Sequence, residues 1–481
     1  MSADNKQGNK GGEIFSSINL KSFLTVVIIL SSIIIISGAL SYFIPQGSFD
    51  IDADGAIITD SYQEGEVSGI APWRVLTAPI RVFASEDALT VIMISIFLLI
   101  MSGVFNLLEK SGGIRVIIAK IMKKLKGHNA SVVCMTVLIF MLFGSFFGMF
   151  EELVTLLPII TVFMLSLGLD TMTGLGACLL AACFGFSAAI TNPFSVGLAS
   201  EVVGVSITDG VWLRAVFFVI VYATLCAFLV LYAKKIQKNP LLSPTYEIDL
   251  EKRESISDVT AAHSDDNRLF KLFSVFFIIQ GVVLLLIATV RVISDYAIPI
   301  LSVSFLGTGI VIGLLATERK SEVFKHLLSG AISMLPAIVM IALASSVKLV
   351  MTESGIIDTI MHYVIELLSG KSKFLAVILI YFLILFLQIF IGSASAKIIL
   401  VMPIVMPIAR ALGLTPTLVI LAYCMADGFT DVILPTNPIL LVALSISKVS
   451  YAKWVRWTWK LQIILFTLSA LVLLLGVAIG Y

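Results

Sequence analysis

The motif Thr-Asn-Pro occurs twice in this sequence, at residues 191–193 and 436–438, and each copy lies inside a strongly apolar segment. Proline lacks a backbone N–H and frees a carbonyl one turn earlier in a helix. Threonine and asparagine add side-chain oxygens beside it, and clustered oxygens suit a small, hard cation. A helix that restarts after the break presents partial positive charge, which suits a carboxylate. Two matched copies therefore favour a binding site over two plain proline kinks.

Ionisable side chains accompany both motifs. Glu151 and Glu152 lie in the stretch FGMFEELVTLL before the first motif, where capping of a helix is the structural alternative to binding. Asp427 and Asp431 precede the second motif at a spacing that puts them on one helical face. Lys397 either contributes to the site or pairs with one of these acids. Because charges within a membrane are costly, all five are candidates for a function.

The composition is that of a polytopic membrane protein. Of the 481 residues, 59% are hydrophobic and 13% charged, and the mean hydropathy is +1.06. A net charge of +1 gives no field that would attract nucleic acid. The five cysteines form no C-x-x-C pair, the four histidines do not cluster, and no P-loop, HExxH or nucleophile elbow occurs. We therefore expect neither an enzyme nor a bound cofactor.

The apolar segments define the expected membrane spans. A bilayer core takes about 20 residues of helix. Seven segments have this length, at roughly 22–44, 87–107, 211–233, 269–290, 297–317, 331–352 and 457–480. Three longer or interrupted regions remain, at 130–168, 172–206 and 373–450.

The lysines and arginines predict the orientation of a multi-pass protein in the cell (inner or plasma) membrane. The basic stretch 108–127 and the polar linker 235–268 are expected in the cytoplasm together with the N-terminal tail 1–21. The acidic loop 45–86 is then expected outside. Segment 109–127 has apolar residues at helical spacing with lysines between them, which predicts an amphipathic helix at the interface.

The two motifs belong to a longer internal repeat. Asn192 and Asn437 are 245 positions apart, and the same shift relates Pro158 to Pro403 and Gly168 to Gly413. Gly148 and Gly392 fit with a shift of 244. This many matches in nearly one register indicate a duplication. Under the predicted orientation the two copies run in opposite directions, a recurring plan of secondary transporters.

The predicted fold is therefore an all-α polytopic membrane protein with an inverted repeat, two re-entrant hairpins and two broken helices. The first half, 22–234, contains a hairpin at 131–167 and a broken helix at 173–206. The second half, 269–481, contains a hairpin at 373–412 and a broken helix at 416–449. Pairs of short, full spans are the alternative to the hairpins.

Two blocks of sequence resemble a known family. The stretch GMFEELVTLLPIITVFMLSLGLD with FGFSAAITNPFSVGLAS, and GSASAK with MPIVMPIA and DGFTDVILPTNP, are similar to the YfcC-like and DcuC-like carriers, the C4-dicarboxylate anaerobic carrier family. The resemblance extends over nearly the whole chain from about residue 22. Phe150 stands where the usual hairpin tip of the family has alanine.

The resemblance implies an elevator-type transporter of the ion-transporter superfamily, which acts as a homodimer and binds sodium and solute at its hairpin tips and unwound helices. It implies a scaffold made of 22–107, 211–233, 297–352 and 457–480. It places the two half-sites at Gly148, Glu151, Glu152, Thr191, Asn192 and Pro193, and at Gly392, Ser393, Ser395, Thr436, Asn437 and Pro438.

These observations predict a secondary active carrier, a symporter or an exchanger, of a small carboxylate-bearing solute. The four acids outnumber Lys397, which favours an amino acid, with basic ones included, over a C4-dicarboxylate as the alternative. The coupling ion is expected to be Na⁺, with Asn192 and Asn437 as candidate ligands, or H⁺. A channel is the alternative of another class, and it would need a continuous wet path.

Overall fold

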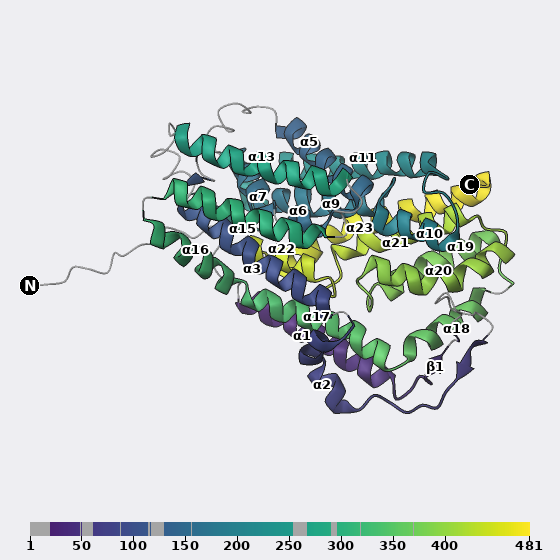
Figure 1. The fold of residues 1–481 in the computed structure, drawn as a ribbon. Coiled ribbons are helices and arrows are strands. Elements are labelled where there is room, and N and C mark those ends of the chain that lie inside the picture. Colours follow the sequence, from purple (N-terminus) through teal and green to yellow (C-terminus); the bar gives the residue numbers. More distant parts are fainter. Residues whose placement is uncertain are drawn as a thin grey trace, which may run out of the picture.

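The computed structural model describes most of the chain, and Figure 1 shows its arrangement. The described residues are 20–48, 50, 61–86, 88–113, 116, 129–154, 156–253, 267–289, 296–317, 319–368 and 370–481. They are almost entirely helical, with one small antiparallel pair of strands, β1 (Gly47–Ser48) and β2 (Gln63–Glu64). Most of the predicted amphipathic helix 109–127 and of the tail 1–21 lies outside the described residues.

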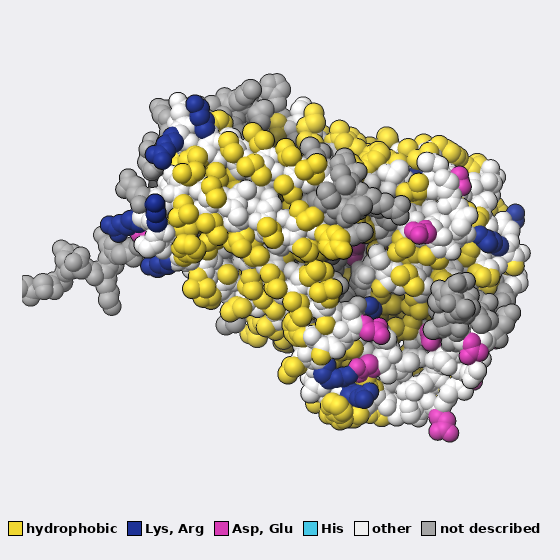
Figure 2. All heavy atoms as spheres, viewed as in Figure 1, with side chains coloured by type: hydrophobic (Ala, Val, Ile, Leu, Met, Phe, Trp, Pro, Cys, Tyr) yellow, Lys and Arg dark blue, Asp and Glu magenta, His cyan; other side chains and the backbone are white. Residues whose placement is uncertain are grey.

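Within the described residues, seven helices are long and apolar enough to cross a membrane, which supports a multi-pass membrane protein. Figure 2 shows a flank covered by hydrophobic side chains, with lysine and arginine side chains beyond its ends rather than on it. Ile278, Val303 and Leu328 are among the exposed hydrophobic residues. An apolar surface of this extent requires lipid as its solvent.

The helices form two groups, which we call the flanking group and the core group. The flanking group consists of α1 (Leu20–Leu40), α2 (Pro72–Arg81) with η2 (Val82–Ala84), α3 (Ala88–Lys110), α13 (Asn267–Thr289), α15 (Ala297–Ala316), α16 (Lys320–Ser333) and α17 (Leu335–Glu353). In this group α3 packs against α15 and α16, and α17 packs against α1 and α2.

The core group contains the segments that carry both Thr-Asn-Pro motifs. Its first half is α5 (Asn129–Leu142), η3 (Phe143–Phe147), α6 (Glu151–Val154), α7 (Leu157–Ser166), α8 (Thr171–Leu175), η4 (Gly176–Leu180), α9 (Ala181–Ser187), η5 (Pro193–Gly197), α10 (Leu198–Val203) and α11 (Val211–Lys238). Its second half is α19 (Lys373–Leu387), α20 (Ala394–Ala411), α21 (Pro416–Asp431), α22 (Pro438–Ser447) and α23 (Tyr451–Ile479). Helix α18 (Ile356–Leu368) joins the groups and packs against α20 and β1.

Helices α3 and α16 pack closely against each other in the flanking group, and α16 was not predicted from the sequence. A Cβ atom on Gly330 would lie 2.5 Å from the carbonyl oxygen of Ser102, and one on Gly103 would lie 2.7 Å from that of Leu327. The Asn106 side chain donates a hydrogen bond of 2.7 Å to a carbonyl of α16. Small residues and polar side chains thus hold the two helices together, as is common in membranes.

Two helices lie in a different group from the one that the family resemblance implies. The segments 211–233 and 457–480 were expected in the scaffold, but α11 packs against α5 and α9, and α23 packs against α19 and α21. The reason is that their buried faces, with Phe217 and Leu225 on α11 and Leu465 on α23, lie against the core group.

At the centre of the core group, α9 crosses α21. The Cys183 thiol donates to the carbonyl of Gly428 at 3.1 Å, and a Cβ atom on Gly428 would lie 2.6 Å from Ser187 Oγ. The rings of Phe184 and Phe429 pack edge to face, with centroids 5.2 Å apart. Both Cys183–Gly428 and Phe184–Phe429 join positions that are 245 residues apart, which is the register of the sequence repeat.

Part of the linker is docked rather than solvated. Residues 239–253, the strap, follow α11 through η6 (Pro240–Leu242) and pack at the start of α8. Asp249 accepts hydrogen bonds from the backbone and hydroxyl of Thr171 at 3.1 and 2.5 Å. Lys252 donates to the Thr171 hydroxyl and to the carbonyl of Ser447, the last residue of α22. Residues 254–266 of the linker lie outside the described residues.

The strap therefore ties the start of the first broken helix to the end of the second. Burial raises the pKa of Asp249 and lowers that of Lys252 to about 8. The cause in both cases is desolvation, which the opposite charge of the partner opposes. A poorly solvated charge is tolerated only where polar groups surround it. The docking of the strap therefore depends on Asp249 and Lys252 together with their hydrogen-bond partners.

We expect Asp249→Ala to release the strap. The substitution leaves the buried backbone N–H and hydroxyl of Thr171 without their acceptor, at a cost of about 1–3 kcal/mol for each lost charged hydrogen bond, and it removes the negative charge beside the buried Lys252 ammonium. Tryptic cleavage after Lys252 and Arg253 should become at least tenfold faster, because local opening exposes the sites. Exposed Glu247, in the same segment, supplies the control Glu247→Ala. Equal cleavage rates in the two variants would contradict this account.

Candidate functional site

The first helix break coincides with the first Thr-Asn-Pro motif. Helix α9 ends at Ser187 and η5 begins at Pro193. Ser145, on η3, donates its hydroxyl to the carbonyl of Ala188 at 2.6 Å, and its own carbonyl accepts from the backbone N–H of Ile190 at 3.0 Å. Ser145, from the neighbouring turn, thus pairs with backbone groups that the break frees.

The second break coincides with the second motif. Helix α21 ends at Asp431 and α22 begins at Pro438. The Trp454 indole N–H donates to the carbonyl of Val432 at 2.6 Å, and the Tyr451 hydroxyl donates to that of Ile433 at 2.5 Å. Here α23, rather than a hairpin tip, supplies the donors for the freed carbonyls.

The two asparagines cap the helices that follow the breaks. Asn192 Oδ1 accepts from the backbone N–H of Phe194 at 2.9 Å, and Asn437 Oδ1 accepts from that of Ile439 at 2.9 Å. Asparagine is a preferred residue at this position. Thr191 donates its hydroxyl to the carbonyl of Phe146 at 3.3 Å. The oxygens that were expected to bind a cation therefore also have a structural role, and sodium binding there stays a prediction.

Each break lies against a glycine at the turn of the preceding helical pair. Gly148 has a φ of +68°, and a Cβ atom there would lie 2.2 Å from Asn192 Oδ1. Such a φ and such an approach both require glycine. A Cβ atom on Gly392 would lie 3.6 Å from the carbonyl oxygen of Thr436. In both halves the turn and the break are thus neighbours.

The two ends of each helical pair also meet. The Asn129 amide donates to the carbonyl of Leu167 at 2.9 Å, which closes the first pair. In the second pair the Lys373 side chain lies beside Gly413, 3.3 Å from the position of a Cβ atom there. The turn of the second pair is shorter than predicted, since α20 already begins at Ala394 with Ser393 as its cap.

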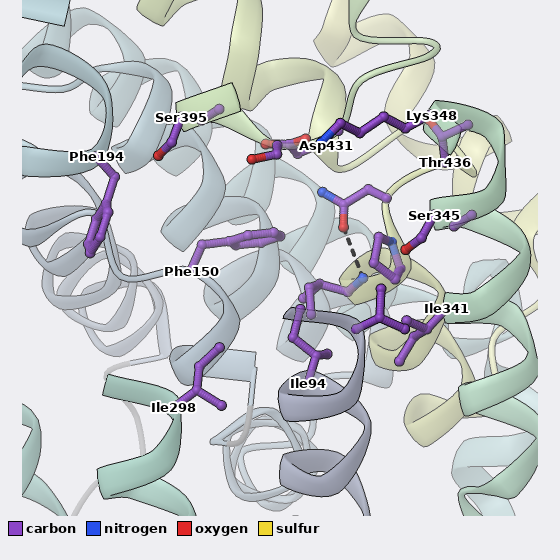
Figure 3. Close-up of a pocket in the computed structure, with 18 of the residues that line it drawn as sticks. Ile94, Phe150, Phe194, Ile298, Ile341, Ser345, Lys348, Ser395, Asp431 and Thr436 are labelled. Carbon is purple, nitrogen blue, oxygen red and sulfur yellow. Dashed lines mark hydrogen bonds between the residues drawn. The ribbon is translucent and has the colours of Figure 1, made fainter. Parts of the chain in front are cut away.

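A cavity of about 350 Å³ lies where the flanking group meets the core group (Figure 3). The flanking group contributes side chains from α3, α15 and α17, and the core group contributes both glycine turns and the second break. The lining includes Ile94, Ile298, Ile341, Ser345, Lys348, Gly148, Phe150, Phe194, Gly392, Ser393, Ser395, Asp431, Thr436, Asn437 and Pro438.

The structure brings some of the predicted site residues to this cavity and leaves others away from it. Those that line it are Gly148, Gly392, Ser393, Ser395, Asp431, Thr436, Asn437 and Pro438. Thr191 and Asn192 lie behind the first glycine turn. The side chains of Glu151, Glu152 and Pro193 lie outside the described part of the structure.

Lys397 and Asp427 form an ion pair inside the core group. Lys397 Nζ lies 2.6 Å from Asp427 Oδ1, and both side chains are 0% exposed. Neither residue is part of the cavity lining. Of the two outcomes that the sequence leaves open for Lys397, the structure shows pairing with an acid. The two charges offset one another, and neither belongs to the described lining of the cavity.

Asp431 and Lys348 are the ionisable residues in the lining, as far as the structure describes it. Asp431 Oδ1 accepts a hydrogen bond of 2.6 Å from Gln388 Nε2. Lys348 and Gln388 were not predicted as site residues. A signal for Gln388 exists, because it is a polar residue in the apolar run FLILFLQIFIG just before the turn. Phe150 and Phe194 both line the cavity, and in Figure 3 the Phe150 ring extends toward its centre.

Comparison with known proteins identifies the family. The family model for the C4-dicarboxylate anaerobic carrier matches residues 21–478.

The chain belongs to the C4-dicarboxylate anaerobic carrier family.

The family is one of carriers, and the relatives of this chain include a putative antiporter and an uncharacterized protein. The chain is 27% identical over 408 residues to the "Putative basic amino acid antiporter YfcC" of Escherichia coli K12, covering 82% of this chain and 79% of that protein. It is also 27% identical over 404 residues to an uncharacterized protein of Haemophilus influenzae, covering 82% and 77% of the two. The solved YdaH transporter of Alcanivorax borkumensis aligns with 95% of this chain and 98% of its own at 17% identity and a TM-score of 0.44.

We expect Lys397→Met and Asp427→Leu each to destabilise this carrier more than the double variant does. Removing one partner leaves an uncompensated buried charge, at a cost of about 3–5 kcal/mol, whereas a well-packed apolar pair can be nearly neutral. Thermal unfolding in detergent measures the effect as a double-mutant cycle. If the losses of stability in the two single variants simply add in the double variant, Lys397 and Asp427 do not act as an ion pair.

Proposed function

We propose that this protein is a secondary active carrier of a small carboxylate-bearing solute, with an amino acid favoured and basic amino acids included. The observation that carries the proposal is that both glycine turns, at Gly148 and Gly392, line one cavity between the two helical groups. A carrier needs a single enclosed site to which two helical groups give access in turn, whereas a channel needs a continuous wet path.

Two helix N-termini support binding of a carboxylate. Helix α20 begins with Ser393 as its cap, α22 begins with Asn437 as its cap, and both caps line the cavity. The partial positive charge at each N-terminus, together with backbone N–H groups, favours an anionic group nearby. The two ends belong to separate elements of the core group, and both open into the cavity.

Asp431 supports a solute that also carries an amine. A carboxylate in a poorly solvated wall attracts an ammonium group and repels a second carboxylate. This favours an amino acid over a dicarboxylate, which stays the alternative. The relative named as a basic amino acid antiporter points the same way and supports exchange as the mode of transport.

Alternating access through an inverted repeat is part of the proposal. It is supported by the contacts Cys183–Gly428 and Phe184–Phe429, where α9 crosses α21. In each contact the two residues are 245 positions apart, so equivalent residues of the two repeats touch each other. It is further supported by matching neighbours, with α5 against α9 and α11, and α19 against α21 and α23. In an elevator mechanism the core group would move as one body past the flanking group.

The coupling ion and the assembly complete the proposal. Asn192 and Asn437 are the proposed ligands for Na⁺. Asn192 Oδ1 accepts one capping hydrogen bond and keeps a second lone pair, whereas Asn437 Oδ1 accepts two, from the backbone N–H groups of Ile439 and Leu440. Asp431 is the candidate for H⁺, because it lies in the cavity wall. The homodimer and the cytoplasmic N-terminus follow from the family resemblance and from the charge pattern.

Counterflow in proteoliposomes tests this function. Vesicles loaded with unlabelled arginine or ornithine should accumulate the labelled amino acid transiently, which a channel does not do. Asp431→Asn should reduce the initial rate at least tenfold, since the ammonium group loses its charged partner. The exposed acid of β2 provides the matched control Glu64→Gln, which should transport normally.

Two results would overturn the proposal. Uptake of succinate or fumarate with no response to arginine, ornithine or neutral amino acids would establish the dicarboxylate alternative. Flux of labelled solute without counterflow would indicate a channel.

A further inference from the structure

Lys348 belongs to the face of α17 that is turned to the cavity. The residues that α17 contributes to the lining are Ile341, Ala344, Ser345 and Lys348, which follow one another at the spacing of one helical face. A lysine near a helix end often extends its charge to the membrane interface instead. Here the residues three, four and seven positions before it all line the cavity, so the helix directs Lys348 into the same space.

Lys348 and Asp431 belong to opposite walls. Lys348 comes from the flanking group and is partly buried, whereas Asp431 comes from the core group and is 7% exposed. In Figure 3 the Lys348 side chain extends from α17 in the direction of Asp431 and Thr436, with Ser345 on the same helix. The described lining thus carries one positive and one negative side chain, the arrangement that complements a zwitterion.

The positive charge comes from one half of the chain. The repeat register pairs Lys348 with Gly103, which is 245 positions earlier. Gly103 packs against the backbone of α16, where a Cβ atom would lie 2.7 Å from the Leu327 carbonyl oxygen. The first half therefore has no cation at the position that matches Lys348. Both charged side chains of the described lining, Lys348 and Asp431, come from the second half of the chain.

We propose that Lys348 determines specificity by binding the carboxylate of the transported amino acid, while Asp431 binds its ammonium group. This rests on the proposed function and deepens it. The solute then bridges the two helical groups, since one partner lies on each. A solute without the carboxylate does not make this charge-assisted contact with Lys348 and therefore binds more weakly.

Decarboxylated analogues test the assignment, because they differ from the amino acid in the carboxylate alone. Dissociation constants of the purified protein are measured for arginine, ornithine and leucine, and for agmatine, putrescine and isoamylamine. The wild-type protein should bind at least one amino acid tenfold or more tightly than its amine. Lys348→Gln should reduce that preference to about onefold, because it weakens the binding of the amino acid and leaves the binding of the amine unchanged. Lys348→Arg should largely retain the preference.

Lys325→Gln serves as the control, because Lys325 is an exposed lysine of α16 away from the cavity. If Lys348→Gln does not fold, Lys348→Met provides the same comparison. A tenfold preference that persists in the Gln or Met variant, or an equal loss of affinity for acid and amine, overturns the role of Lys348. Absence of amino acid binding by the wild-type protein overturns the proposed function itself, so the two failures are distinguishable.

Discussion

The structure depends on the need to satisfy every backbone polar group at membrane depth. Two helices are interrupted there, and several of the backbone groups freed at each break have a defined partner. Ser145 serves the first break, and Trp454 and Tyr451 serve the second. These donors come from other elements of the core group, so neither break can exist in an isolated helix. The breaks therefore fix how the turns, α21 and α23 pack.

The two acidic residues of α21 are one helical turn apart, yet they have different surroundings. Asp427 and Asp431 lie on the same helix, but Asp427 faces α20 and pairs with Lys397, where both are fully buried. Asp431 is the last residue of α21, next to the break, and reaches the cavity wall. The end of the helix thus opens the space that exposes the second acid. Gln388 then holds that carboxylate from the far side.

The interface between the two helical groups gives the cavity its character. The core group contributes glycine turns, helix N-termini and Asp431, whereas the flanking group contributes mainly apolar side chains together with Ser345 and Lys348. A ligand there touches both groups at once. In the proposed alternating-access mechanism, relative movement of the groups would connect binding with access, and the strap, which ties the ends of the two broken helices, would move with the core group.

The sequence by itself determined the apolar spans, the repeat spacing and the positions of both breaks, because these depend on hydropathy and on proline within a helix. It could not determine that Lys397 is neutralised by Asp427, or that Lys348 reaches the cavity, since distant elements decide which side chains meet. It also missed α16, the docked strap, and the membership of α11 and α23 in the core group. Those features arise from glycine contacts and buried polar pairs between segments far apart in the chain, which only tertiary packing brings together.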